Sequence, residues 1–230
     1  MIIAYWSDFV CPFCYIAETR MKKALDELGI RGECRLDFRA FELNPAARPR
    51  SERNMVEGFS HHYGMTMEQA EAQVGRICAM GRAEGLDFNY DTAHNCNTFD
   101  ALRLTKLAQS KGRALGDAFV ERMYRAFFSE NLTLSDRSVL LSLAEEMGLG
   151  RGETEELLDG DMYADAVRTD ETAARHLGIS AVPFFVINGK YGIPGAVDTE
   201  RLVKILSDAY NEEESQDTEK GMTCGPDGCR

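Results

Sequence analysis

The order of the predicted elements indicates an α/β fold that is interrupted by an all-helical insertion. Strand and helix patterns alternate over residues 1–47, and a second set returns over residues 156–211. Helical patterns alone occur between them, over residues 48–155, and residues 212–230 are mostly acidic and polar. We therefore predict one α/β domain built from two halves, an inserted helical domain and a flexible C-terminal tail.

The first half is predicted to be a β–α–β unit. Residues 2–6 form a short apolar run, as expected of a buried strand, and residues 34–43 alternate apolar and charged side chains, as expected of a second strand. Pro12 suits the first position of the helix between them, and Gly29 suits its end. The apolar residues of this helix recur at helical spacing: Ile16, Ala17, Met21, Ala24, Leu25 and Leu28.

The second half is predicted to contain a helix, a β-hairpin and a closing helix. Residues 163–179 have a helical pattern that ends at Gly178, and "VPFFVING" (182–189) has the composition of a strand followed by a tight turn. Residues 191–193 are the expected partner strand, and residues 198–210 have an amphipathic helical pattern. The full order, β–α–β, helices, then α–β–β–α, is that of a thioredoxin-like fold with a helical domain inserted after its second strand.

Charge and composition exclude several classes of partner. The 230 residues carry a formal net charge of −12, which argues against nucleic acid or an anionic membrane surface as the main partner. The sequence shows neither a signal-peptide pattern nor an apolar run long enough to cross a membrane, so we predict a cytoplasmic protein. Disulfides in that compartment are usually transient, catalytic or redox-sensing, which makes the seven cysteines informative.

Cys11 and Cys14 form a Cys-Pro-Phe-Cys pair at the junction of the first strand and the first helix. Cys11 falls at the expected N-cap, where unpaired N–H groups and the helix dipole stabilise a thiolate. Cys14 lies three residues later on the same helical face, close enough to close a disulfide. An attacking thiolate with a resolving thiol suffices for thiol–disulfide exchange and needs neither a metal nor a nucleotide cofactor. A structural disulfide or half of a zinc site is the alternative, although no second pair follows at the usual zinc spacing.

A proline opens the strand of the second hairpin, where it removes a hydrogen-bond donor from the sheet. A thioredoxin fold carries a cis-proline beside its dithiol at this point, so we predict a cis Val182–Pro183 bond. The backbone of Val182 would then pair with a substrate chain near Cys11. The predicted substrate-binding residues are Pro12, Phe13, Val182 and Pro183. An ordinary edge proline at the start of a strand is the alternative.

The remaining cysteines fall into two groups. Three occur singly in apolar or helical patterns and are predicted to be small hydrophobic residues or unreactive thiols: Cys34, Cys78 and Cys96. Cys224 and Cys229 lie near the end of the chain in "TCGPDGC", where glycine and proline bend the backbone enough to bring the two thiols together. We predict that they form an auxiliary redox pair for the Cys11–Cys14 dithiol. A disordered end or an adventitious metal binder is the alternative.

These motifs together resemble the DsbA family of thiol oxidoreductases, and more closely its FrnE-like branch, over roughly residues 1–210. The resemblance rests on five stretches: "DFVCPFCYIA", "FRAFELNP", "NTFDALRL", "VPFFVING" and "IPGAVDTERL". It implies that Cys11 is the nucleophile, Cys14 the resolving thiol and Pro183 the cis-proline. The implied activity is disulfide oxidoreduction or isomerisation on protein or peptide thiols.

Two other functions remain open at this point. The same order of elements occurs in kappa-class glutathione transferases and 2-hydroxychromene-2-carboxylate isomerases, which use a serine or a single cysteine at the position of Cys11 and bind glutathione. The second thiol, Cys14, favours dithiol exchange instead, with glutathione left open as a co-substrate. A chaperone that holds unfolded chains without redox chemistry is the third interpretation.

Overall fold

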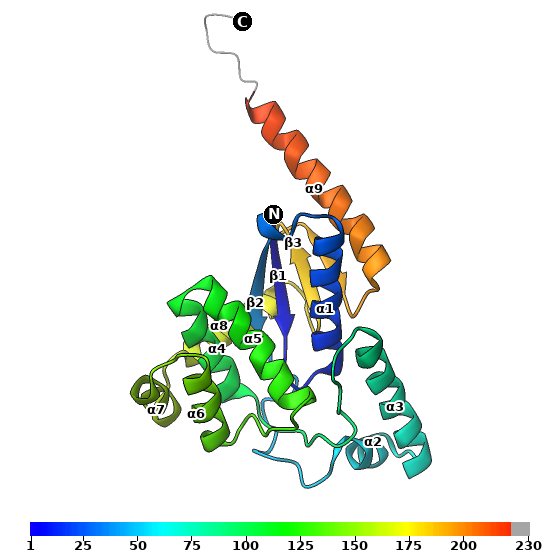
Figure 1. The fold of residues 1–230 in the computed structure, drawn as a ribbon, viewed down its shortest axis with the longest axis vertical. Helices are drawn as coiled ribbons and strands as arrows, with labels where there is room; N and C mark the ends of the chain where they lie inside the picture. The colour runs from blue at the N-terminus through cyan, green and yellow to red at the C-terminus, as the bar shows by residue number, and fades with distance from the viewer. Residues whose placement is uncertain (222–230) are drawn as a thin grey trace, which may run out of the picture.

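The computed structural model describes the backbone of residues 1–221 and the side chains of residues 1–213 (Figure 1). Its sheet has the strand order β2-β1-β3-β4, in which β1 and β2 are parallel and the other two pairs are antiparallel. The strands are β1 (Ile2–Ser7), β2 (Arg35–Ala40), β3 (Phe184–Ile187) and β4 (Tyr191–Pro194). This mixed sheet confirms the predicted thioredoxin-like fold.

The register between β1 and β3 places the two predicted parts of the site side by side. Trp6, near the end of β1, pairs with Phe184, the first residue of β3. The chain that leaves β1 toward the dithiol therefore lies next to the chain that enters β3 from Pro183. At the other end of β3, Asn188 and Gly189 have φ angles of 50° and 69°, so the tight turn predicted from this dipeptide is confirmed.

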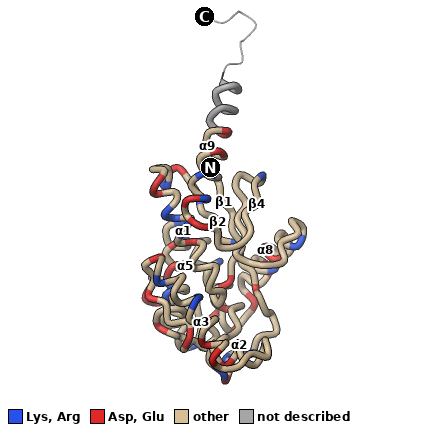
Figure 2. Tube along the Cα trace, turned by 90° about the vertical axis from the view of Figure 1, so that its right-hand side faces the viewer, with Lys and Arg blue, Asp and Glu red and all other residues tan. Residues whose placement is uncertain are grey.

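Helices cover both faces of the sheet. Helices α1 and α9 pack against each other, and α8 lies on the opposite side of the sheet from α1 (Figure 2). The indole of Trp6 is buried and its Nε1 donates to the carbonyl oxygen of Asp170 on α8, at 2.8 Å. The helices of this part are α1 (Pro12–Glu27), the short 3₁₀ turn η1 (Arg31–Glu33), α8 (Ala164–His176) and α9 (Thr199–Gly221).

The inserted region between β2 and α8 is helical, and within described residues 48–155 the structure shows an isolated β-bridge, Asn54 with His94, but no strand. Thr66 and Gln69 form the predicted capping box, and Asn54 and Glu57 form a second one at the start of α2. The helices are α2 (Met55–Tyr63), α3 (Met67–Ala83), α4 (Phe99–Lys111), α5 (Arg113–Phe128), α6 (Arg137–Glu146) and α7 (Arg151–Asp159).

The insertion and the α/β part share one hydrophobic core. Tyr15 of α1 stacks on Tyr124 of α5 with ring centroids 4.8 Å apart, and Phe128 stacks on Phe88 at 4.7 Å. Tyr15 and Tyr124 are distant in the sequence, and the contact between their rings fixes α5 against the first turn of α1. The insertion is therefore part of the support of the dithiol.

The C-terminal helix is longer than the sequence pattern predicted. The expected helix ended at residue 210 and a flexible tail began at 212, but α9 continues to Gly221, so that prediction is wrong for residues 212–221. The glutamates, glutamine and lysine of this stretch are good helix formers, and they extend a helix that packing has already nucleated. Lys190 and Tyr191 also contact Glu212 and hold the helix to the hairpin. Within the described residues, no helix is both long and apolar enough to cross a membrane.

Candidate active site

The dithiol lies where β1 passes into α1. Cys11 is the N-cap residue of α1, with φ −84° and ψ 113°, and Pro12 occupies the first helical position, both as predicted. The Cys11 N–H donates to the Asp8 carbonyl oxygen at 3.1 Å, and the Cys14 N–H donates to the Cys11 carbonyl oxygen at 3.1 Å. The loop is thus closed by its own backbone, and the sulfur of Cys11 lies at the positive end of the helix dipole.

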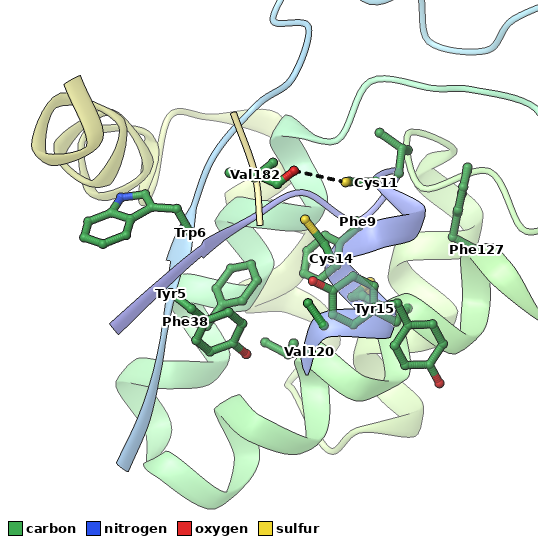
Figure 3. Packing of buried hydrophobic residues seen from close by; sticks show 14 of the residues in the cluster. Tyr5, Trp6, Phe9, Cys11, Cys14, Tyr15, Phe38, Val120, Phe127 and Val182 are labelled. Carbon is green, nitrogen blue, oxygen red and sulfur yellow. Dashed lines mark hydrogen bonds between the residues drawn. The ribbon is translucent and has the colours of Figure 1, made fainter. Parts of the chain in front are cut away.

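The loop before β3 meets this dithiol directly (Figure 3). The Val182–Pro183 peptide bond is cis, as predicted. The Sγ atom of Cys11 donates a hydrogen bond to the Val182 carbonyl oxygen at 3.6 Å. The structure therefore brings Cys11 next to Val182 and Pro183, which lie more than 170 positions later in the sequence.

The two thiols differ in surroundings more than in exposure. Cys11 is 4% exposed and Cys14 is 1% exposed, so both thiols are buried. Burial raises the pKa of Cys14 well above its ordinary value, and the neighbouring Cys11 sulfur raises it further. Both are free thiols in this structure. Cys14 is therefore held as a neutral thiol until its proton is removed.

Two hydroxyl groups beneath the dithiol were not predicted from the sequence. Ser7, at the end of β1, and Tyr124, on α5, are fully buried, and their side-chain oxygens are hydrogen-bonded to each other. The Ser7 hydroxyl opposes part of the rise in the pKa of Cys14. The sequence carried no signal for this contact, because 117 residues separate the two hydroxyls.

Asp8 is a buried acid on the other side of the same loop. Its side chain is almost fully buried, Oδ2 accepts the Leu43 N–H at 2.8 Å, and Oδ1 has no hydrogen-bond partner among the described residues. Burial raises the pKa of Asp8 from an ordinary 3.8 to about 6, although the Leu43 amide and the Thr98 hydroxyl offset part of the rise. From the sequence, Asp8 flanks the dithiol and is a candidate either to tune it or to contact a substrate.

A cavity of about 740 Å³ lies between the dithiol loop and the insertion. Asp8, Val10 and Pro12 form its wall on the dithiol side. The facing wall carries aromatic and charged side chains from the segment around α2: Arg48, Glu52, Arg53, Phe59, His62 and Tyr63. A second cavity of about 190 Å³ lies against Val182 and Pro183, on the approach to β3. Phe13, predicted to contact substrate, is 38% exposed beside the dithiol.

Of the five remaining cysteines, three lie within the described residues. Cys34, Cys78 and Cys96 are buried, and burial raises the pKa of each thiol. Cys96 borders the large cavity. Cys224 and Cys229 lie outside the described residues. Across the part of the chain that the structure describes, no group of three or more His, Cys, Asp or Glu side chains is arranged to hold a metal ion.

Comparison with known families agrees with this geometry. Residues 2–207 match the family model described as the DSBA-like thioredoxin domain. The chain belongs to the DsbA-like thioredoxin family. This confirms the family predicted from the sequence motifs, while the assignment to the FrnE-like branch stays a prediction.

Individual relatives match nearly the whole chain. The uncharacterized protein YwbO of Bacillus subtilis (strain 168) is 30% identical over 208 residues, which cover 90% of this chain and 96% of YwbO. A probable DsbA oxidoreductase from Streptomyces coelicolor is 32% identical, with a TM-score of 0.86 over 100% of this chain and 98% of that one. A 2-hydroxychromene-2-carboxylate isomerase is 18% identical, with a TM-score of 0.69 over 95% and 98% of the two chains, and shares the fold alone.

Proposed function

We propose that this DsbA-like oxidoreductase catalyses thiol–disulfide exchange on protein or peptide substrates, with Cys11 and Cys14 as its redox pair. One observation carries the proposal: the Cys11 sulfur lies at the N-terminus of α1 and 3.6 Å from the Val182 carbonyl oxygen, beside a cis-proline. A helix N-terminus favours a thiolate, and the backbone beside it can align an extended chain.

The roles of the two thiols follow from their surroundings. Cys11 is flanked by Val10 and Pro12, which line the large cavity, whereas Cys14 faces the buried core. Cys11 therefore attacks a substrate disulfide, its sulfur bonds to one substrate sulfur, and the other leaves as a thiolate. Cys14 then loses its proton and attacks the Cys11 sulfur, which closes the Cys11–Cys14 disulfide and releases the second substrate thiol. The reverse sequence oxidises a substrate dithiol.

The surface around Cys11 fits a polypeptide. Phe13, Leu43 and Tyr63 are 38%, 47% and 59% exposed, and together with the cavity they offer apolar contacts on the substrate side. The cavity also contains the cationic side chains of Arg48 and Arg53, which suit a carboxylate. A thiol peptide such as glutathione is therefore proposed as a co-substrate, and longer chains as the main substrates.

A glutathione-dependent transferase or isomerase is the second candidate, because the large cavity would also hold a tripeptide and a small organic substrate. Such an enzyme needs one activated group at position 11. The inner thiol separates the two candidates, since dithiol exchange requires Cys14 and the alternative does not.

The test uses a peptide that carries one disulfide, together with the variants Cys11→Ser, Cys14→Ser and, as a control for another buried cysteine, Cys34→Ser. We expect Cys11→Ser to lose exchange by about three orders of magnitude or more. Cys14→Ser should trap a mixed disulfide between Cys11 and the peptide, visible by mass spectrometry, and Cys34→Ser should turn over like the wild type. Full turnover by Cys14→Ser with glutathione, and no trapped peptide, would favour the transferase or isomerase.

The chaperone interpretation is tested with the same proteins. A holdase without redox function would prevent aggregation of an unfolded chain equally well as wild type and as the double variant Cys11→Ser/Cys14→Ser. Exchange activity that disappears in the double variant supports the oxidoreductase instead. Recovery of a scrambled two-disulfide peptide by the wild type would extend the proposal to isomerase activity.

A further inference from the structure

The large cavity beside the dithiol has one buried charged side chain in its wall, that of Asp8. The other acids and bases that line the cavity are exposed at its rim: Arg48, Glu52, Arg53 and His62. Arg48 and Glu52 also pair with each other at 3.9 Å, and solvent screens charges at such a rim. Asp8 is 1% exposed, so among these charges its carboxylate is the one that solvent screens least.

One oxygen of the Asp8 carboxylate lacks a hydrogen-bond partner. Oδ2 accepts the Leu43 N–H at 2.8 Å, which ties the acid to the segment after β2. Oδ1 is buried and accepts no hydrogen bond from any described residue. Burial raises the pKa of this carboxyl to about 6, although the neighbouring amides and the Thr98 hydroxyl oppose part of the rise, so the acid is mostly ionised at pH 8. A ligand that brings a hydrogen-bond donor removes the cost of leaving such an oxygen unpaired.

Three aromatic rings, Tyr90, Phe59 and Tyr63, also line this cavity and form an aromatic row from a buried ring to an exposed one. Tyr90 is 4% exposed, and its ring centroid lies 6.4 Å from that of Phe59, with the two planes at 89°. The Phe59 centroid lies 5.3 Å from that of Tyr63, which is 59% exposed. The face of such a ring attracts a cation, most strongly where water is excluded.

We propose that the large cavity is a subsite for a cationic group of the substrate, an ammonium or a guanidinium, which donates to the Asp8 carboxylate and packs on the aromatic row. This inference rests on the proposed function, because the same cavity wall contains Val10 and Pro12, the two neighbours of Cys11. A substrate bonded to the Cys11 sulfur extends past this wall. A lysine or arginine side chain, or a free N-terminal amine, close to the substrate cysteine then enters the cavity. A carboxylate elsewhere on the same substrate can still pair with the exposed arginines of the rim.

The first experiment measures which small thiols Cys11 retains as mixed disulfides. In Cys14→Ser, the Cys11 thiolate attacks a small disulfide, bonds to one of its sulfurs and releases the other as a thiolate, and no inner thiol resolves the product. The protein is equilibrated at pH 8 with aminoalkanethiols of two, four and six carbons, or with hydroxyalkanethiols of the same lengths, each with its own disulfide. Mass spectrometry gives the ratio of amino to hydroxy mixed disulfide at each length.

The ratio is then compared between proteins, so that the intrinsic chemistry of the thiols cancels. At one length or more, it should be about tenfold higher in Cys14→Ser than in Asp8→Asn/Cys14→Ser, because the asparagine lacks the charge that receives the ammonium. Phe59→Leu in the Cys14→Ser background removes one ring and should lower the ratio about threefold. Glu52→Gln in the same background removes an exposed acid of the rim and should leave the ratio unchanged.

These variants also separate the subsite from a purely structural role of Asp8. An asparagine at this position still offers an oxygen to the Leu43 amide, so Asp8→Asn should weaken retention of the amino thiols alone. Equal losses for amino and hydroxy thiols would assign Asp8 to the loop only and overturn the proposal. Equal losses in Asp8→Asn and Glu52→Gln would show a general charge effect and overturn it as well.

The second experiment identifies the source of the cation with cysteine peptides in the same assay. One peptide has lysine two residues from the cysteine, one has arginine there, one has a free N-terminal amine, and a blocked peptide with norleucine is the reference. At least one cationic peptide should be retained about tenfold better than the reference and lose that advantage in Asp8→Asn. Equal retention of all four would overturn the proposal. The proposed function is judged separately by turnover of the wild type, since turnover without this charge preference leaves only the subsite wrong.

Discussion

The two sides of the dithiol loop are built differently, although consecutive residues form them. Ser7 faces inward, where its hydroxyl is bonded to Tyr124 within a stack of aromatic rings. Asp8 faces the large cavity and keeps one carboxylate oxygen without a hydrogen-bond partner in the described part of the chain. The inner side is therefore tightly packed and its hydroxyls are paired, while the cavity side retains an acid whose charge is costly. The inner side is suited to hold the resolving thiol, and the cavity side to receive a substrate.

The largest expected difference between the two sides is in how much a truncated side chain lowers the free energy of unfolding. Phe128 is fully buried, with ring centroids 4.7 Å from Phe88 and 5.8 Å from Tyr15, so Phe128→Ala should lower the free energy of unfolding by about 3–5 kcal/mol. Tyr63, on the cavity side, is 59% exposed, and Tyr63→Ala should change it by about 0.5 kcal/mol or less. Urea denaturation measures both. Similar losses in the two variants would mean that the two sides are equally packed.

The second prediction concerns the pH dependence of the free energy of unfolding, which arises from Asp8 on the cavity side. The pKa of Asp8 is raised by burial from 3.8 to about 6, so the folded protein binds this proton more tightly than the unfolded chain does. The resulting stability is fully present below about pH 4 and is lost as the pH rises through about 6. The asparagine side chain in Asp8→Asn does not titrate. The free energy of unfolding of this variant, relative to that of the wild type, should therefore rise between pH 4 and pH 7 by at most about 3 kcal/mol.

The control for this prediction is Glu52→Gln, which removes an acid from the exposed rim of the same cavity. Unfolding free energies of the three proteins are compared at pH 4, 5, 6 and 7. If Asp8→Asn follows Glu52→Gln at every pH, burial of the Asp8 carboxylate has no energetic consequence and the contrast between the two sides is lost.

The sequence predicted the local features of the site better than its long-range contacts. Short-range signals located Cys11 at a helix N-cap, the Asn188–Gly189 turn and the proline before β3, because each depends on a few neighbouring residues. The pairing of Ser7 with Tyr124 depends on how the insertion packs, and no local pattern encodes it.

At the C-terminus, charge and composition predicted a flexible tail where the structure has a helix. The acidic stretch after residue 210 suggested a flexible tail, but helix propensity and contacts of Glu212 and Glu213 with the β3–β4 hairpin extend α9 to Gly221. The predicted auxiliary pair, Cys224 and Cys229, lies beyond the described residues and stays a prediction.

The smallest expected effect concerns Cys96, a third thiol close to the loop. It borders the cavity but is 2% exposed, and burial raises its pKa to about 11. At pH 7 only about one molecule in ten thousand would then carry a Cys96 thiolate, too few for rapid reaction. Cys14 is also buried with a raised pKa, but it lies one helical turn from Cys11, and its attack is intramolecular.

We therefore expect limiting iodoacetamide at pH 7 to modify Cys11 and leave Cys96 unmodified, as mapped by mass spectrometry. Gentle oxidation of Cys14→Ser should likewise give no Cys11–Cys96 disulfide. Such a disulfide would show that the cavity side supplies a resolving thiol of its own, and the division of roles between the two sides would be wrong.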